Sequence, residues 1–457
     1  MPRRGLIPLF VALLFLTCFV SVHAFADSQV RIVRLSTVDG SVQIDRAIGG
    51  GYEKAMPNLP VTQGTKVRAQ GEGRAEIEFE DRSTVRIVPG SVVEFPLLSL
   101  RDSGARATTV EVQEGTVYVS FAGSKGDEFA VTFGHETVRL NQAVHFRVQM
   151  NDTAATLAVF KGQLTIEGPS GNVELVKKQA AAFDLDNNDQ VKVSKNVEEL
   201  VSDEWDKRQD QYHDTYLARN SGLSPYSYGM SDLNYYGSFI DVAGYGTLWQ
   251  PYFTGAGWDP FMDGAWCWYP GAGYMWVSAY PWGWLPYRYG SWMFVPGYGW
   301  GWQPGSTWGT WNTVPVVVNA PQGFGGIRPP AINAPVHNTL VVNRGIGVVP
   351  TARPGSKLVL QTNTAGLGIP RGSIRNPAQV SHEVMQRGSV TMSVRPQPAP
   401  MPTRASQPSW GNASASRGAG SSSAAGSNQR MSAPPAPAPA PMPHPAMSAP
   451  SGSSPHR

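Results

Sequence analysis

Residues 30–195 consist mainly of short runs in which apolar and polar residues alternate. The clearest runs are 74–79, 84–88, 116–120 and 163–167, and Gly- or Pro-containing turns separate them. A period of two places successive side chains on opposite faces of a β-strand. Many short strands at this spacing predict a β domain of the sandwich, barrel or solenoid type, with the charged side chains of each strand facing water.

The alternation stops at residue 196, and a helical pattern replaces it up to residue 219. Trp205, Tyr212 and Tyr216 lie on one stripe of a helix, with acidic residues early and arginines late. That charge order suits the helix macrodipole. We therefore predict one amphipathic helix over 196–219, which links the β domain to the next region of the chain.

A repeated tryptophan motif dominates residues 230–311. Trp-x-Trp-x-Pro begins at Trp266, Trp282 and Trp300, and twelve of the fourteen tryptophans lie between Trp249 and Trp311. Repetition of this kind is typical of a modular structure. Each period has room for two short strands and a turn, so the sequence predicts a Trp-rich module with a β-hairpin per repeat.

The tryptophans have two interpretations. In the first, the rings form the core of a small module, because each brings a large apolar surface. In the second, a subset forms an exposed platform that stacks on sugar rings, with polar groups beside it. The candidate ligand-binding residues are Trp266, Trp268, Trp276, Trp282, Trp284, Tyr287, Arg288, Trp292, Trp300 and Trp302.

The two ends of the chain differ from its centre in composition. Arg3 and Arg4, an apolar run and a small-x-small site at 24–26 form the three parts of a secretory signal peptide over 1–26. An uncleaved N-terminal anchor is the alternative. We expect residues 312–395 to form a weakly structured linker and 396–457, rich in Pro, Ala, Ser and Gly, to be a disordered tail. The signal peptide predicts an exported protein, either periplasmic or at the cell surface.

Charge is distributed unevenly along the chain. Residues 320–457 hold twelve Lys or Arg and one acid, a net charge of +11, and residues 1–26 add +2. Because the whole chain has a net charge of +3, residues 27–319 are left at −10. The basic tail is either simply solvated or in contact with an anionic surface. Nucleic acid is not expected as a partner, since Asp259 and Asp263 outweigh Arg288 in the aromatic region.

Residues with catalytic or metal-binding potential are scattered. No two histidines have metal-ligand spacing on one element, and no nucleophile elbow, phosphate loop or zinc-protease motif is present. Asp184, Asp186 and Asn188 follow a calcium-loop spacing, but Asp189 replaces the required glycine and Lys195 the bidentate glutamate. A polar turn is therefore predicted there, and we expect no cofactor, metal or enzymatic activity.

The β domain resembles the periplasmic domain of the FecR family. The resemblance rests on 64–68, on Gly-Arg-Ala-Glu-Ile-Glu-Phe-Glu-Asp at 73–81, on 129–132, on 144–148 and on 159–166. Departures include Ala69, Arg82 and Asn141-Gln142-Ala143, where the family usually has Thr, Gly and Arg-Gly-Thr. FecR proteins are envelope regulators of a sigma factor. The family's anti-sigma segment and transmembrane helix have no counterpart here, so that role does not follow from the domain.

Residues 200–311 resemble the Trp/Tyr/Gly-rich domain of unknown function that follows a FecR-like domain in some exported bacterial proteins. The segments Asp-Glu-Trp-Asp-Lys-Arg-Gln-Asp at 203–210 and Trp-Gly-Trp-Leu-Pro-Tyr-Arg-Tyr-Gly at 282–290 carry this likeness. The resemblance implies no activity. We expect a non-catalytic envelope protein that acts as an interaction module for a glycan, the cell wall or a protein. The alternative is a FecR-like signalling or sensor subunit.

Overall fold

The computed structural model is mainly β and describes most of the chain between residues 31 and 394. The described ranges are 31–217, 228–306, 308, 311–331, 340–343 and 355–394. The predicted signal peptide and the predicted disordered tail lie outside them. Within these ranges, no helix combines the length and the apolar character that a membrane-spanning segment requires.

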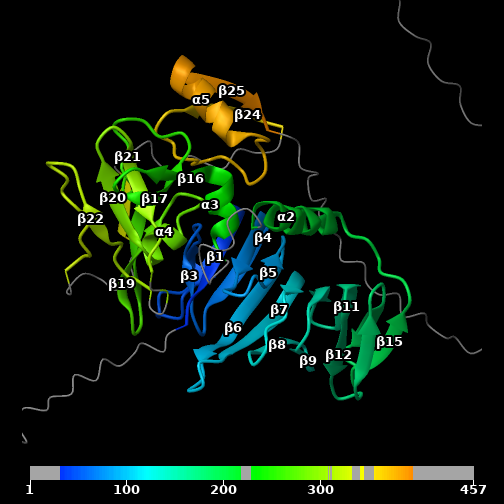
Figure 1. The fold of residues 1–457 in the computed structure, drawn as a ribbon. Coiled ribbons are helices and arrows are strands. Elements are labelled where there is room, and N and C mark those ends of the chain that lie inside the picture. Colours follow the sequence, from blue (N-terminus) through cyan, green and yellow to red (C-terminus); the bar gives the residue numbers. More distant parts are fainter. Residues whose placement is uncertain are drawn as a thin grey trace, which may run out of the picture. The chain divides into compact units, whose positions relative to one another are not determined.

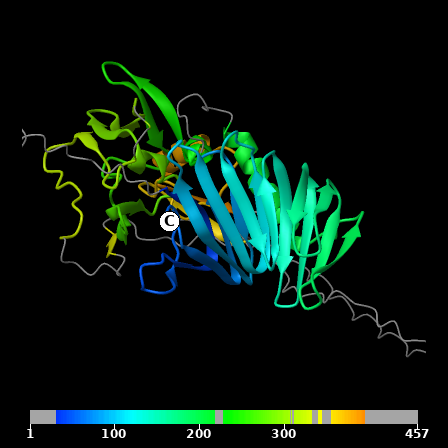
Figure 2. The ribbon, with the colours of Figure 1, turned by 90° about the horizontal axis from the view of Figure 1, so that it is seen from below.

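The first part of the chain forms one 15-stranded sheet, whose order along its main path is β13-β12-β9-β8-β7-β10-β11-β14-β15 (Figures 1 and 2). Strand β7 also pairs with β5 and β6, and these pair with β4, so the first six strands join the path there. The strands are β1 Val33–Asp45, β2 Glu53–Lys54, β3 Pro60–Val61, β4 Lys66–Glu78, β5 Thr84–Ile87, β6 Ser91–Leu100, β7 Arg106–Phe121, β8 Glu128–Phe133, β9 Glu136–Leu140, β10 Val144–Met150, β11 Ala154–Lys161, β12 Gln163–Glu167, β13 Val173–Val176, β14 Ala180–Asp184 and β15 Gln190–Ser194.

Alternate residues of these strands form the core, as the period of two predicts. Ile77, Val85, Val119, Val131 and Phe146 are fully buried in one apolar cluster. Burying such side chains removes about 25 cal/mol of unfavourable hydration free energy per Å² of apolar surface. Residues 31–217 contain no cysteine and therefore no disulfide, so this apolar core carries the stability of the domain.

Helix α2, Val201–Leu217, confirms the helix expected over 196–219 but begins later (Figure 1). Asp203 explains the start, because its carboxylate accepts a hydrogen bond from the backbone N–H of Leu200 at 2.9 Å. A side chain that reaches back to the residue before the helix is half of a capping box. The buried residues of α2 include Trp205, Asp206 and Tyr212, so its covered face is partly charged.

The described residues of the Trp-rich region form two helices and two sheets. Helices α3 Met230–Tyr236 and α4 Leu285–Arg288 accompany a five-stranded sheet, β16-β17-β21-β20-β22, and a three-stranded sheet, β19-β18-β23. Their strands are β16 Gly237–Val242, β17 Gly246–Pro251, β18 Asp263–Tyr269, β19 Gly273–Ser278, β20 Ser291–Val295, β21 Gly299–Gln303, β22 Val317–Asn319 and β23 Leu340–Asn343.

The three Trp-x-Trp motifs adopt two different structures. The first and third lie on strands β18 and β21 of hairpins, where Trp266 pairs directly with Trp276 and Trp302 with Trp292. The middle copy does not form a hairpin, in contrast to the prediction of one per repeat. Trp284 is instead the N-cap residue of helix α4. Pro286 lies in the first turn of that helix, where a backbone N–H would have no partner within the helix, so the proline is well tolerated.

Residues 355–394 are more ordered than the predicted linker over 312–395. They form β24 Lys357–Gln361, α5 Pro377–Arg387 and β25 Ser389–Ser393. The Nε1 group of Trp282 donates to the carbonyl of Ala365 at 2.6 Å, and the hydroxyl of Tyr236 donates to that of Ile369 at 2.7 Å. The segment is ordered because its few apolar residues insert into the aromatic core of the preceding region, which composition alone does not reveal.

Trp282 gives a direct test of this aromatic core. Its ring lies 4.8 Å from that of Trp249 and stacks on that of Tyr280 at 5.0 Å. Trp282→Ala should lower the free energy of unfolding by about 3–5 kcal/mol, because a large cavity replaces the ring. Urea unfolding of the mature protein would measure the loss. Trp268→Ala is the control, since that side chain is only half-buried; equal losses would contradict the described packing.

Candidate functional site: a buried ion network at the junction

The structure places nine of the ten sequence-predicted ligand residues in the interior. Their exposed fractions do not exceed 5%, and only Trp268 is half-buried. Arg288 is among the nine: its guanidinium donates to the carbonyls of Trp276 and Asn312 and lies 5.4 Å from the ring of Trp284. Burial lowers the pKa of Arg288 to about 10. These side chains form the core of the Trp-rich region, in agreement with the first interpretation of the sequence.

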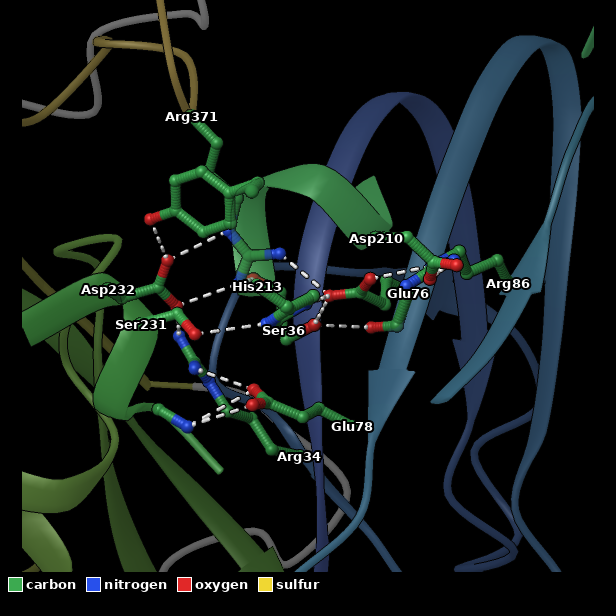
Figure 3. A network of polar contacts seen from close by, with 12 residues as sticks. Arg34, Ser36, Glu76, Glu78, Arg86, Asp210, His213, Ser231, Asp232 and Arg371 are labelled. Carbon is green, nitrogen blue, oxygen red and sulfur yellow. Dashed lines mark hydrogen bonds and ion pairs between the residues drawn. The ribbon is translucent and has the colours of Figure 1, made fainter. Parts of the chain in front are cut away.

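A different set of residues forms a dense group of charges, much of which Figure 3 shows. Five carboxylates, three arginines and two histidines meet where the β domain, α2, α3 and a loop before α5 come together. Every carboxylate in the group lies within ion-pair distance of an arginine or a histidine. We call this group the junction network; its members are Arg34, Glu76, Glu78, Arg86, His145, Asp206, Asp210, His213, Asp232 and Arg371.

Alternation on the strands creates the first half of the network. Glu76 and Glu78 on β4 and Arg86 on β5 point away from the apolar core, and β4 and β5 are paired. The expectation that such charged side chains face water is wrong for this face. Helices α2 and α3 cover it, so the exposed fractions of these three residues are 0%, 3% and 1%. The sequence gives no sign of a covering layer over a single strand face.

Glu76 lies at the centre of the network. Its Oε1 accepts hydrogen bonds from Ser36 at 2.6 Å, from His213 Nε2 at 3.0 Å and from Arg371 at 2.7 Å. Its Oε2 accepts from Arg86 Nε at 2.8 Å. Burial by itself would raise the pKa of the Glu76 carboxyl, but the charges of His213, Arg86 and Arg371 hold that pKa well below its usual range. The carboxylate is therefore ionised and fully paired.

Asp232 on α3 joins the Trp-rich region to the same group. It lies 2.6 Å from Arg34 of β1, and Arg371 donates to both of its oxygens at 2.7 and 2.8 Å. Tyr212 of α2 donates to it as well, at 2.7 Å. Burial would raise the pKa of Asp232, but Arg371 and Arg34 lower it. Arg371, which contacts both Asp232 and Glu76, is thus the bridge across the junction.

Two histidines and a lysine also contact the carboxylates of this group. Lys161 lies 3.7 Å from Asp210, and His213 lies 3.0 Å from Glu76. His145 lies 2.9 Å from Asp206, and Arg86 also contacts that carboxylate. Burial tends to lower the pKa of His213, but the Glu76 carboxylate outweighs it, and the net effect raises the pKa. The network therefore favours His213 in its charged form.

One sequence signal could have indicated this group. Asp206 and Asp210 are four residues apart on a predicted helix, with His213 three residues further on, so all three share a face. Arg34 and Arg371 had no such signal, because they lie 337 positions apart in the chain. Among the described residues, no three His, Cys, Asp or Glu side chains are grouped as they would be around a metal ion. At the polar turn predicted near residues 184–189, a carboxylate oxygen of Asp189 lies 3.0 Å from Nδ1 of His135.

Comparison with known proteins identifies two regions in this chain. The sequence model of the FecR protein family matches residues 65–165, and that of the family of unknown function DUF6600 matches residues 230–322. No curated protein matches the chain.

Two crystal structures, at 1.65 and 2.50 Å resolution, of a protein described as an anti-sigma factor from Parabacteroides distasonis ATCC 8503 are similar at a low level. Each is 16% identical with a TM-score of 0.25, and the match covers 29% of this chain and 59% of the other. That similarity is too low to support an inference about this chain. The family matches are specific, and they agree with the resemblances in the sequence. The chain thus contains a FecR domain and a DUF6600 domain, and the junction network joins Glu76 of the first to Asp232 of the second.

Proposed function

We propose that this protein is a non-catalytic, exported envelope protein that acts as an interaction module, with its FecR and DUF6600 domains working as one unit. The observation that carries the proposal is the junction network. Its charges are used to hold the two domains together. A binding protein needs such a rigid base for the surfaces that it presents.

The state of the charged residues supports a structural role for them. A general acid or base has to come within hydrogen-bond reach of a substrate. Glu76 and Asp232 are at most 1% exposed, and several arginine, histidine or hydroxyl donors already occupy their oxygens. A substrate could engage these carboxylates only after the junction had opened. The network therefore suits cohesion better than proton transfer.

Further contacts between the two domains support the single unit. Asn58 donates to the carbonyls of Ser278 and Tyr280 at 3.0 and 2.7 Å. The hydroxyl of Tyr269 donates to the carbonyl of Pro60 at 2.9 Å. All these groups are buried, so separation of the domains would expose apolar surface and leave polar groups to be hydrated again. Domains held by such an interface are expected to move together.

A regulatory or sensor role is the second candidate, and the FecR match over residues 65–165 favours it. A regulator needs an element with two states that a signal can bias. His213 is the candidate for such an element, because it is a titratable group that contacts both Glu76 and Ser231 and because the Glu76 carboxylate raises its pKa. Capture of a membrane-bound anti-sigma protein by the mature chain would favour this role over that of a simple binder.

Cell fractionation tests the proposed location and role. Cells that produce the full chain should contain a product shortened by its first 26 residues, outside the cytoplasm and sedimenting with envelope material. A chain that starts at residue 27 is the control and should remain in the cytoplasm. Full-length protein in the cytoplasm, or hydrolysis of a cell-wall glycan by the purified mature protein, would contradict the proposal.

Arg371→Met tests the bridge across the junction. The change leaves the buried carboxylates of Glu76 and Asp232 without a shared partner, so we expect a loss of about 3–5 kcal/mol in the free energy of unfolding. Urea unfolding would measure the loss, and limited proteolysis would show whether the domains separate. Arg101→Met is the matched control, because its pair with Glu128 is exposed, and no measurable change is expected. Two equally stable variants would rule out the bridge.

The pH dependence of stability tests His213. Its pKa in the folded protein is above the ordinary 6.5, so its contribution is complete below pH 6.5 and is lost as the pH rises through the folded value. The Glu76 pKa is below 4.5, so its contribution is present above pH 4.5 and is lost as the pH falls through its folded value. Unfolding measured between pH 2 and 9 should therefore show both contributions between pH 4.5 and 6.5, and a loss of stability on the acidic and on the alkaline side of that range. His213→Gln should reduce the alkaline decline, whereas the exposed His382→Gln should leave it unchanged.

A further inference from the structure

A cleft of about 530 Å³ lies beside the junction network. Its walls come from the end of α2, from α3, from the segment after β17 and from the start of α5. These four pieces are far apart in the sequence, and the fold brings them together at one place. The lining residues are Tyr216, Asn234, Tyr235, Tyr252, Arg375, Asn376, Pro377, Ala378 and Gln379.

The described lining of the cleft carries a positive charge. Among the described residues of that lining, Arg375 is the one charged side chain, and none is acidic. Arg375 is exposed, and within the described residues no hydrogen bond or ion pair engages its guanidinium. Arg371, four positions earlier, is by contrast saturated by Asp232 and Glu76. A guanidinium in this position can form two parallel hydrogen bonds with a carboxylate of a ligand.

The other walls of the cleft combine aromatic rings and carboxamides. The half-buried rings of Tyr216 and Tyr252 face the cleft, and the buried ring of Tyr235 supports that of Tyr216 edge to face, with the two centroids 5.0 Å apart. Asn376 caps α5 by accepting from the backbone N–H of Gln379 at 3.3 Å, and the side chains of both remain exposed. Carboxamides bond hydroxyl groups both as donors and as acceptors. Aromatic rings pack against the C–H face of a sugar ring.

The fold holds these walls in place. The hydroxyl of Tyr235 accepts a hydrogen bond from the backbone N–H of Ile374 at 2.9 Å, which ties α3 to the residue before Arg375. Asn234 donates to the carbonyl of Tyr216 at 2.6 Å and thereby joins α3 to α2. A largely pre-formed pocket with a few converging polar groups is the usual form of a small-ligand site.

We propose that this cleft binds a saccharide that carries a carboxylate. Arg375 pairs with the carboxylate, the exposed carboxamides of Asn376 and Gln379 bond the hydroxyls, and the half-buried rings of Tyr216 and Tyr252 pack against the sugar. The inference rests on the proposed function as an interaction module and gives that function a ligand class. The shared chemistry occurs in the muramic acid of cell-wall glycan whose stem peptide has been removed and in the uronic acids of acidic polysaccharides.

Titration calorimetry on the mature protein tests the cleft with three probes: N-acetylmuramic acid oligosaccharides without stem peptide, trigalacturonate, and neutral chitotriose. We expect binding of one of the two acidic probes, and which one binds distinguishes wall from acidic polysaccharide. Chitotriose should bind at least tenfold more weakly. Arg375→Met should weaken the acidic probe about tenfold to a hundredfold, because a charge-assisted pair is lost. Arg387→Met, in the last turn of α5 and outside the lining, is the matched control.

Several results would overturn the proposal that the cleft binds an acidic saccharide. If chitotriose bound as tightly as the acidic probes, the site would not be specific for a carboxylate. Equal affinities of Arg375→Met and wild type would place the site elsewhere, and binding of a free stem peptide without sugar would assign it to a peptide. Retention of the protein on envelope material without affinity for any probe would also overturn the cleft while leaving the proposed interaction role intact.

Discussion

The structure depends on a carboxylate that is buried and ionised at the same time. Glu76 is fully covered, and an unpaired charge in such a place would cost several kcal/mol. It is tolerated because groups from three other parts of the chain converge on it: Ser36 and Arg86 of the β domain, His213 of α2, and Arg371 from the C-terminal part. If one of these segments were displaced, the Glu76 carboxylate would stay buried in the protein interior without one of its hydrogen-bond partners. The ion network therefore specifies how the domains fit together, beyond the apolar burial that drives their folding.

The tryptophans stabilise the DUF6600 domain by burying apolar surface. The DUF6600 domain has short strands, small helices and, in its described residues, no disulfide, so it needs large side chains to bury sufficient surface. Rings such as Trp249, Trp282 and Trp292 pack against one another within about 6 Å, mostly tilted or edge to face. This packing also explains why residues 355–394 are ordered. Their apolar side chains and carbonyls complete the aromatic core, and this contact positions Arg371 and Arg375.

These two constraints shift the candidate binding surface away from the tryptophan repeats. The repeats attract attention in the sequence because aromatic residues serve both in cores and in carbohydrate-binding platforms. In the structure, the exposed polar side chains Arg375, Asn376 and Gln379 at the start of α5 and the half-buried rings of Tyr216 and Tyr252 line one cleft. Arg371 of the ion network and Arg375 of the cleft lie on the same loop before α5, so cohesion of the domains and the shape of the cleft both depend on that loop.

The sequence by itself determined the class of the fold and the two family regions. Period-two alternation identified strands such as β4 and β7, helical spacing identified α2, and the repeated motif located the Trp-rich domain, because each is a local pattern. Only the tertiary structure decided which polar strand face is covered. Glu76 and a solvated strand glutamate look identical in sequence, and the difference comes from a histidine 137 positions away and an arginine 295 positions away. Burial is a property of non-local packing, so the network and the cleft could appear only once distant segments had been brought together.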